Sequence, residues 1–141
     1  MTTKEYLGQI RRLSCRIDNK LSELYQFRTL STSITIATGS EHIVSSPSND
    51  KMDKTIVKIM EMEEDINKLI NVLIEKKNVI VAQIDSLDDA SEYEVLYLRY
   101  VSNMTFEEIA ENMAYSTRQV IRIYNNALKN FENKFGLGYM S

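Results

Sequence analysis

The sequence has few of the residue types on which most enzymes and metal proteins depend. Its 141 residues include one cysteine, Cys15, and one histidine, His42. A single cysteine cannot form an internal disulfide, which fits a reducing environment. A lone imidazole or thiolate supplies only one of the about four ligands that a zinc ion takes. The sequence also has no glycine-rich phosphate loop and no Ser-His-Asp set. We therefore expect no enzymatic activity, no metal site and no cofactor.

Long apolar runs are also lacking. No segment approaches the about 20 consecutive apolar residues that a membrane-spanning helix needs. We find no secretory signal at the start of the chain. Both observations predict a cytoplasmic protein that has no membrane partner.

Positive charge is scarce but unevenly distributed. The net charge is −3, which by itself argues against binding to nucleic acid. Residues 1–30 carry six Lys and Arg against three Asp and Glu, and residues 116–141 carry four against one. Residues 41–94 carry six against thirteen, so the middle is acidic. Such weakly basic ends predict modest affinity for DNA, and tight binding would need a dimer or a partner such as RNA polymerase.

Two long helical patterns precede the last third of the chain. In the first, over residues 3–30, apolar side chains recur at steps of three and four residues. Its main positions are Leu7, Ile10, Ile17, Leu21 and Leu24. The second follows a cap at Asn49 or Asp50 and has a heptad step. Its positions are Met52, Ile56, Ile59, Glu63, Ile66, Ile70, Leu73, Lys77, Ile80, Ile84 and Leu87.

The segment between these patterns, residues 31–50, is rich in Ser and Thr and contains Gly39 and Pro47. This composition predicts a loop. At 1.5 Å per residue, the two helices would be about 40 and 50 Å long and could pair across the loop. We therefore predict an all-α fold. Residues 1–88 would form a long antiparallel helical hairpin, a coiled-coil-like arm.

The second helix has more apolar positions than one partner helix can cover. The additional positions are Val57, Met60, Met62, Leu69, Ile74 and Val81. We therefore expect a homo-oligomer, with a dimer favoured. Glu63 and Lys77 interrupt the heptad pattern, and polar residues at such positions can fix register or subunit number.

Residues 89–141 have the pattern of a separate domain that contains two further helix starts. Thr105 is followed three residues later by Glu108, and Ser116 by Gln119. In such a capping box the hydroxyl accepts a hydrogen bond from the backbone N–H three residues on, and the longer side chain reaches back. Between the two patterns, Ala114 stands where a glycine often turns the chain. The pattern therefore predicts a helix-turn-helix, whose second helix lies in the DNA major groove.

The two predicted helices have distinct faces. Apolar residues lie where the helices would touch, namely Phe106, Ile109, Ala110, Met113, Val120, Ile123, Tyr124, Ala127 and Leu128. The other face of the second helix has no carboxylate and suits base edges and phosphates. Its predicted DNA-contacting residues are Ser116, Thr117, Arg118, Gln119, Ile121, Arg122, Asn125 and Asn126.

The run YEVLYLRYVSNMTFEEIAENMAYSTRQVIRIYNNALKNF, residues 93–131, resembles the region-four helix-turn-helix of sigma-70 factors. It is most similar to the version in small phage-encoded regulators of late, packaging or lysis genes, of the ArpU/RinA-like type. The matching features are Leu98-Arg99-Tyr100, the stretch from Thr105 to Ala110, Ser116, and Ala127-Leu128. The resemblance implies an activator of phage or prophage late genes in a bacterial host cell, with a contact to RNA polymerase.

The sequence leaves three functions open. The leading hypothesis is a sequence-specific transcription regulator that binds double-stranded DNA. The second is a DNA-packaging assembly protein of the small-terminase type, which also combines a helix-turn-helix with oligomerising helices. The third is a helical scaffold that binds only protein.

Overall fold

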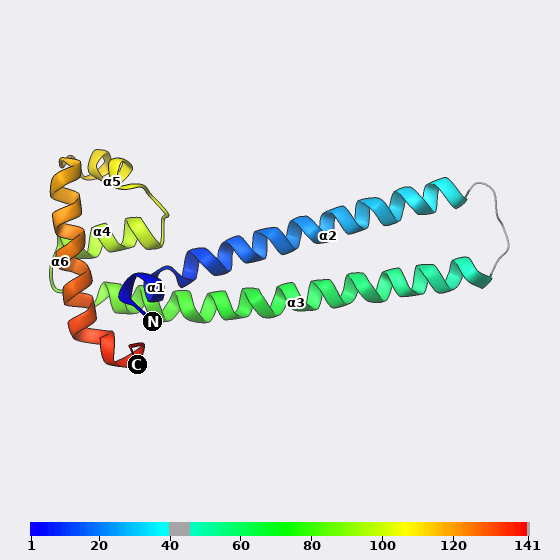
Figure 1. The fold of residues 1–141 in the computed structure, drawn as a ribbon, viewed down its shortest axis with the longest axis horizontal. Coiled ribbons are helices and arrows are strands. Elements are labelled where there is room, and N and C mark those ends of the chain that lie inside the picture. Colours follow the sequence, from blue (N-terminus) through cyan, green and yellow to red (C-terminus); the bar gives the residue numbers. More distant parts are fainter. Residues whose placement is uncertain (40–45, 141) are drawn as a thin grey trace. The chain divides into compact units, whose positions relative to one another are not determined.

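The computed structural model describes residues 1–39 and 46–140, and every regular element among them is a helix (Figure 1). The elements are α1 (Thr3–Leu7), α2 (Gln9–Gly39), α3 (Ser46–Asp85), α4 (Ala90–Tyr100), α5 (Phe106–Met113), α6 (Thr117–Phe135) and the 3-10 helix η1 (Gly136–Gly138). The predicted all-α class is confirmed. In this described part, no helix combines the length and the apolar character needed to cross a membrane.

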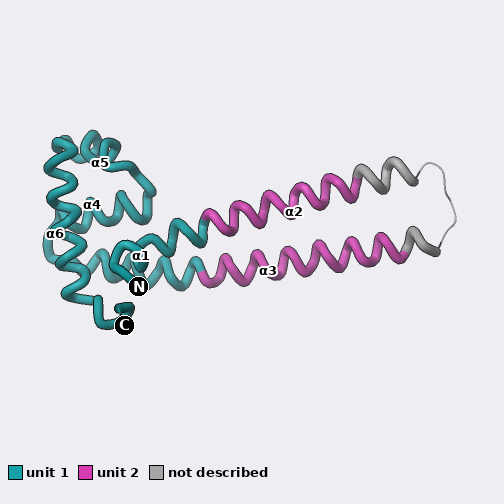
Figure 2. Tube along the Cα trace, viewed as in Figure 1, with its two compact units in different colours: residues 1–14, 73–141 teal, residues 15–72 magenta. Residues whose placement is uncertain are grey.

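The helices divide into two compact units (Figure 2). Unit 1 contains residues 1–14 and 73–141, and unit 2 contains residues 15–72. The sequence predicts a single boundary after residue 88, whereas the structure divides α2 and α3 within their lengths. The reason is that residues from both long helices belong to the same core as α4, α5 and α6.

The core of unit 1 brings together residues from all six helices. It consists of Leu7, Ile10, Ile80, Ile84, Val95, Leu96, Leu98, Ile109, Ala110, Val120, Tyr124, Ala127 and Phe131. Phe131 is the largest of the completely buried side chains. Burial of one such apolar side chain stabilises a fold by about 1.5–3 kcal/mol. This core therefore fixes α6 against α1, α4 and α5.

The first helical pattern is interrupted near its start. The sequence predicts one helix over residues 3–30, but α1 ends at Leu7 and Gly8 caps it. The Gly8 N–H still donates to the Lys4 carbonyl at 2.9 Å, and Arg12 N–H donates to the Gly8 carbonyl at 3.1 Å. Gly8 therefore marks a break of one residue between two helices that otherwise follow the predicted stripe.

The predicted loop over residues 31–50 is wrong at both ends. Helix α2 continues to Gly39, and α3 begins at Ser46, before the predicted caps at Asn49 or Asp50. Ser and Thr cost a helix at most about 0.7 kcal/mol each relative to Ala, too little to end one by themselves. Pro47 lies in the first turn of α3, where its missing N–H breaks no helical hydrogen bond. Residues 40–45, which include His42, lie outside the described residues.

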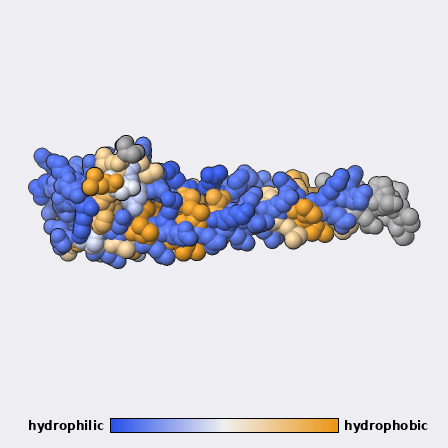
Figure 3. Space-filling view, turned by 90° about the horizontal axis from the view of Figure 1, so that it is seen from below, coloured by the Kyte–Doolittle hydropathy of each residue, from blue (hydrophilic) through white to orange (hydrophobic). Residues whose placement is uncertain are grey.

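Unit 2 consists of the adjoining parts of α2 and α3. Among the side chains of unit 2 that the structure describes, Ile17, Leu24 and Ile66 are the buried apolar ones. An ion pair joins Arg28 to Glu63. Other apolar side chains of the unit stay exposed, including Leu21, Tyr25, Leu30, Met52, Ile56, Val57 and Met60. The sequence places Leu21, Met52 and Ile56 on the packed stripes, so those stripes are only partly buried. Figure 3 shows apolar patches on one face of the molecule, among hydrophilic side chains.

Candidate nucleic-acid interface

Helix α5 begins with the capping box that the sequence predicts. The Thr105 hydroxyl accepts a hydrogen bond from the Glu108 N–H at 3.2 Å. In return, the Thr105 N–H donates to the Glu108 carboxylate at 3.3 Å. Two backbone donors at the helix start are thereby satisfied, which fixes the point where α5 begins.

A tight turn joins α5 to α6. Ala114 has the left-handed conformation, with φ of 57° and ψ of 40°, where a glycine is more usual. The Tyr115 N–H donates to the Ala110 carbonyl at 2.9 Å, which closes the turn. Ser116 then caps α6, accepting from the Gln119 N–H at 3.1 Å. The return bond from the Gln119 side chain is absent within the described residues, so only half of the second predicted capping box forms.

The inner face of α6 holds it in place. Val120, Ala127 and Phe131 are fully buried, and the Phe106 ring of α5 meets the Tyr124 ring edge-on at 4.9 Å. The Ile123 and Leu128 side chains pack half-buried against the same core.

The Tyr124 hydroxyl also lies 2.5 Å from that of Tyr100 on α4. Burial, helped by this hydrogen bond, raises the pKa of the Tyr100 phenol well above its ordinary value. The Tyr100 phenol therefore stays neutral at physiological pH, and its hydrogen bond with Tyr124 ties α6 to α4.

Arg99 is a structural residue at the end of α4. Its guanidinium lies 4.4 Å from the centroid of the Phe106 ring and donates to the Met104 carbonyl at 3.1 Å. A guanidinium held over an aromatic face contributes about 0.5–2 kcal/mol. Both contacts fix the start of α5 relative to α4, so Arg99 is already engaged within the protein.

The predicted contact residues lie on the outer face of the first part of α6. Six are exposed: Ser116, Arg118, Ile121, Arg122, Asn125 and Asn126. The other two, Thr117 and Gln119, are half-buried. Within residues 1–39 and 46–140, the side chains of Arg118, Arg122, Asn125 and Asn126 form no hydrogen bond or ion pair. These donors and acceptors are therefore available to an external ligand.

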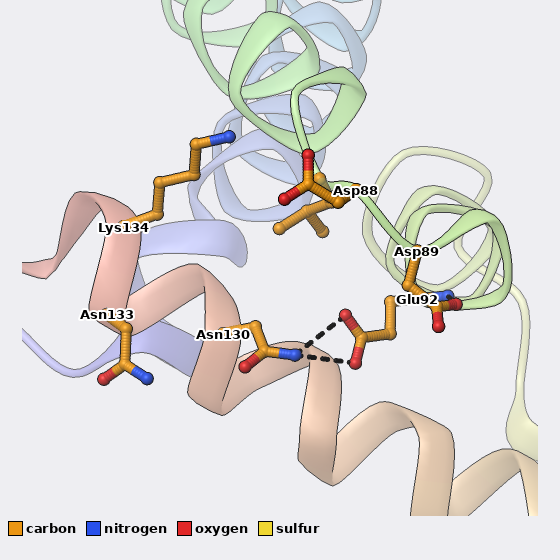
Figure 4. Close-up of a pocket in the computed structure, with 7 residues that line it drawn as sticks. Asp88, Asp89, Glu92, Asn130, Asn133 and Lys134 are labelled. Carbon is orange, nitrogen blue, oxygen red and sulfur yellow. Dashed lines mark hydrogen bonds between the residues drawn. The ribbon is translucent and has the colours of Figure 1, made fainter.

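Polar side chains in the last part of α6 are used inside unit 1. The Asn130 amide donates to both oxygens of Glu92 on α4, at 2.8 and 3.0 Å (Figure 4). The Lys134 ammonium donates to the Ser86 carbonyl at 2.6 Å, and Glu132 accepts from Thr3 at 3.4 Å. These bonds hold the end of α6 against α4, α1 and the turn before α4.

Figure 4 shows an open polar depression beside these bonds. Its volume is about 450 Å³, and its walls include Asp88, Asp89, Glu92, Asn130 and Lys134. Asp89 caps α4 by accepting from two backbone N–H groups, at 2.8 and 3.1 Å. Most of the charged groups here therefore already have structural partners.

Lys129 belongs to the same outer face but was not among the predicted contact residues. It is exposed, and it lies seven residues after Arg122 and eleven after Arg118, which places all three on one side of the helix. The sequence spacing alone is therefore sufficient to predict Lys129 as a further DNA-contacting residue. On α5, which packs against α6, Glu107 and Glu111 are exposed and carry negative charge.

Residues 33–132 match the model of a family described as "Protein of unknown function (DUF1492)". The chain belongs to this family. The DUF1492 match includes α5, the turn and all eight predicted contact residues, and it ends within α6. Searches among curated proteins and among solved structures gave no match.

Proposed function

We propose that this DUF1492 protein is a sequence-specific transcription regulator that binds double-stranded DNA. In this proposal α5 and α6 form a helix-turn-helix, and the outer face of α6 enters the major groove. One observation carries it. Arg118 and Arg122 are exposed on a part of α6 that has no carboxylate, and they have no partner within the described residues. In the last part of the same helix, by contrast, Asn130 and Lys134 are bonded to neighbouring elements.

Each residue type on this face suits one kind of contact. Arg118 and Arg122 can each donate two hydrogen bonds to O6 and N7 of one guanine, or bind a phosphate. Gln119, Asn125 and Asn126 suit adenine, and Ile121 can meet a thymine methyl group. Ser116 and Thr117 lie at the start of α6, where hydroxyl and backbone N–H groups favour phosphate.

A single copy would bind DNA only moderately, because Glu107 and Glu111 on α5 repel phosphate. We therefore propose a homodimer in which α2 and α3 of unit 2 form the antiparallel hairpin and the association surface. The exposed apolar side chains of unit 2 support this. A twofold dimer would bind an inverted repeat with half-sites about one or two helical turns apart. Activation of phage late genes through RNA polymerase follows from the resemblance to region four.

Selection from a library of random double-stranded DNA tests the proposal without assuming any binding site. We expect enrichment of one motif with inverted-repeat symmetry. Arg122→Ala should weaken binding to that motif by about 1–3 kcal/mol. Lys76→Ala removes the same charge from an exposed position on α3 and should leave affinity unchanged.

Other outcomes would favour the alternative functions. A ring of eight or more subunits in solution, measured by mass, would favour a DNA-packaging assembly protein over a regulator. No enriched motif and no binding at low salt would overturn DNA binding and leave a scaffold that binds protein. In none of these functions is the protein an enzyme, and none requires a cofactor.

A further inference from the structure

Lys129 lies on the outer face of α6, opposite the side that packs into the core of unit 1. Successive residues of an α-helix are about 100° apart around its axis. Lys129 therefore lies within about 20° of Arg118 and of Arg122. It lies about 180° from Val120, whose side chain is completely buried. Its own side chain is accordingly exposed, on the same line along the helix as the two arginines.

The backbone that carries Lys129 is held in place within unit 1. Ala127 and Phe131, two residues before and two residues after it, are completely buried. The next residue, Asn130, donates from its amide to both oxygens of Glu92 on α4, at 2.8 and 3.0 Å. Lys129 thus starts from a fixed point of the fold, although its side chain is in contact with solvent.

The charge of Lys129 is not paired within the part of the chain that the structure describes. Two carboxylates come near this part of α6, and each accepts a hydrogen bond from another group. Glu92 accepts from Asn130. Glu132, on the next turn of α6, accepts from the Thr3 hydroxyl at 3.4 Å. The Lys129 ammonium is therefore available to an anion outside the protein.

Lys129 lies too far along α6 to reach the same bases as the two arginines. It follows Arg122 by seven residues and Arg118 by eleven, which is about 10.5 and 16.5 Å along the helix axis. The major groove is about 12 Å wide and winds around the duplex, so a straight helix follows its floor only for a short distance. In helix-turn-helix proteins the first residues of the second helix contact the base edges. With both arginines at the bases, Lys129 would be level with the sugar-phosphate backbone.

We propose that Lys129 binds a backbone phosphate at the edge of the major groove, beside the bases that Arg118 and Arg122 read. This inference rests on the proposed function. A lysine ammonium is a compact charge on a flexible stem, which suits phosphate, and it lacks the planar fork with which arginine pairs with a guanine. Phosphate contacts orient a protein on the duplex and release counterions but carry no sequence information. Lys129 would thus set affinity and orientation, while the two arginines set specificity.

Lys129→Gln tests this contact because it removes the charge and keeps most of the stem. The measurement is affinity for the selected motif and for unrelated DNA between about 50 and 200 mM salt. The loss of one phosphate contact should reduce the slope of log affinity against log salt by about 0.9. Affinity should fall by about three- to tenfold on both DNAs at about 0.1 M salt. Lys129→Arg should restore both values, and Lys76→Gln, at an exposed position of α3, should change neither.

The outcomes separate this proposal from the function on which it rests. A wild-type slope for Lys129→Gln, together with weakened binding by Arg122→Ala, would overturn only the role of Lys129. A loss of affinity for the selected motif alone would also overturn it, because phosphate contacts are blind to sequence. Failure of the wild-type protein to bind either DNA would overturn both proposals. Thermal melting of Lys129→Gln should match the wild type, since the side chain is exposed.

Discussion

The two units of this protein bury their apolar side chains to very different extents. Unit 1 has a continuous core to which all six helices contribute, with Phe131 and Leu96 fully buried. The described residues of unit 2 belong to two helices, α2 and α3. Its Tyr25 side chain is 73% exposed and its Met60 side chain is 61% exposed. Unit 1 therefore has the core of an independent fold, whereas unit 2 leaves much of its apolar surface uncovered.

This difference suggests a division of tasks. In a pair of helices, each helix buries one apolar stripe of its partner, and any further apolar positions remain exposed to water. Exposed apolar patches on a folded protein often mark a surface of association. We infer that a second copy covers unit 2, while unit 1 positions α6. The predictions below test this contrast, from the largest expected effect to the smallest.

Phe131→Ala should cause the largest loss of stability. It removes the largest fully buried side chain of unit 1, and such changes cost about 3–5 kcal/mol. Tyr25→Ala, in unit 2, should change the free energy of unfolding of one copy by less than about 0.5 kcal/mol. Chemical denaturation monitored by circular dichroism measures both. An equal loss of unfolding free energy in the two variants would contradict the difference in burial between unit 1 and unit 2.

The double variant Ile56→Lys and Met60→Lys should dissociate the proposed dimer. Each side chain is more than half exposed in one copy, so the substitutions should leave the helices intact. Charged residues at these positions should weaken association by about 3 kcal/mol, or about a hundredfold in the dissociation constant. Sedimentation equilibrium measures the mass of the double variant and so shows whether it is still a dimer.

Asn67→Lys, at an exposed polar position of α3, is the matched control and should keep the wild-type mass. Dimers of unchanged affinity in the double variant would exclude this part of α3 from the association surface.

Ala114→Gly should stabilise unit 1 by about 0.5–1 kcal/mol. A left-handed residue with a Cβ atom costs about 1–2 kcal/mol, and the greater freedom of glycine in the unfolded chain offsets part of the gain. Ala82→Gly makes the same change inside α3 and should destabilise by about 1 kcal/mol. Thermal melting compares the two. A destabilised Ala114→Gly would contradict the left-handed turn between α5 and α6.

The smallest effect should come from the ion pair of unit 2. The Arg28 and Glu63 side chains are about half exposed, and pairs in contact with solvent contribute about 0–1 kcal/mol. A double-mutant cycle with Arg28→Ala and Glu63→Ala should therefore give a coupling energy below about 1 kcal/mol. A coupling of about 2 kcal/mol or more would mean that the pair is desolvated, as in an interface.

The local parts of the candidate site could be predicted from the sequence. The cap at Thr105, the turn at Ala114 and the cap at Ser116 each depend on hydrogen bonds between residues at most five positions apart, so short patterns contain them. The exposure of Arg118 and Arg122 follows from the apolar period of α6 alone.

The non-local features were not predictable in this way. The contact between Thr3 and Tyr139 joins positions 136 residues apart, and no periodicity connects them. The placement of α1 in unit 1 depends on that contact. The predicted loop failed for a different reason. Ser and Thr lower helix propensity only slightly, so composition alone did not locate the helix ends.

A binding titration with the double variant Arg118→Ala and Arg122→Ala tests the central claim most directly. The ligand is a fluorescent duplex containing the selected motif, and the control is Lys58→Ala with Lys76→Ala, which removes two charges from exposed positions of α3. The proposed function predicts that the α6 variant binds at least about tenfold more weakly than the control while melting at the same temperature. Equal affinity of the two double variants would contradict it, because the outer face of α6 would then have no part in binding.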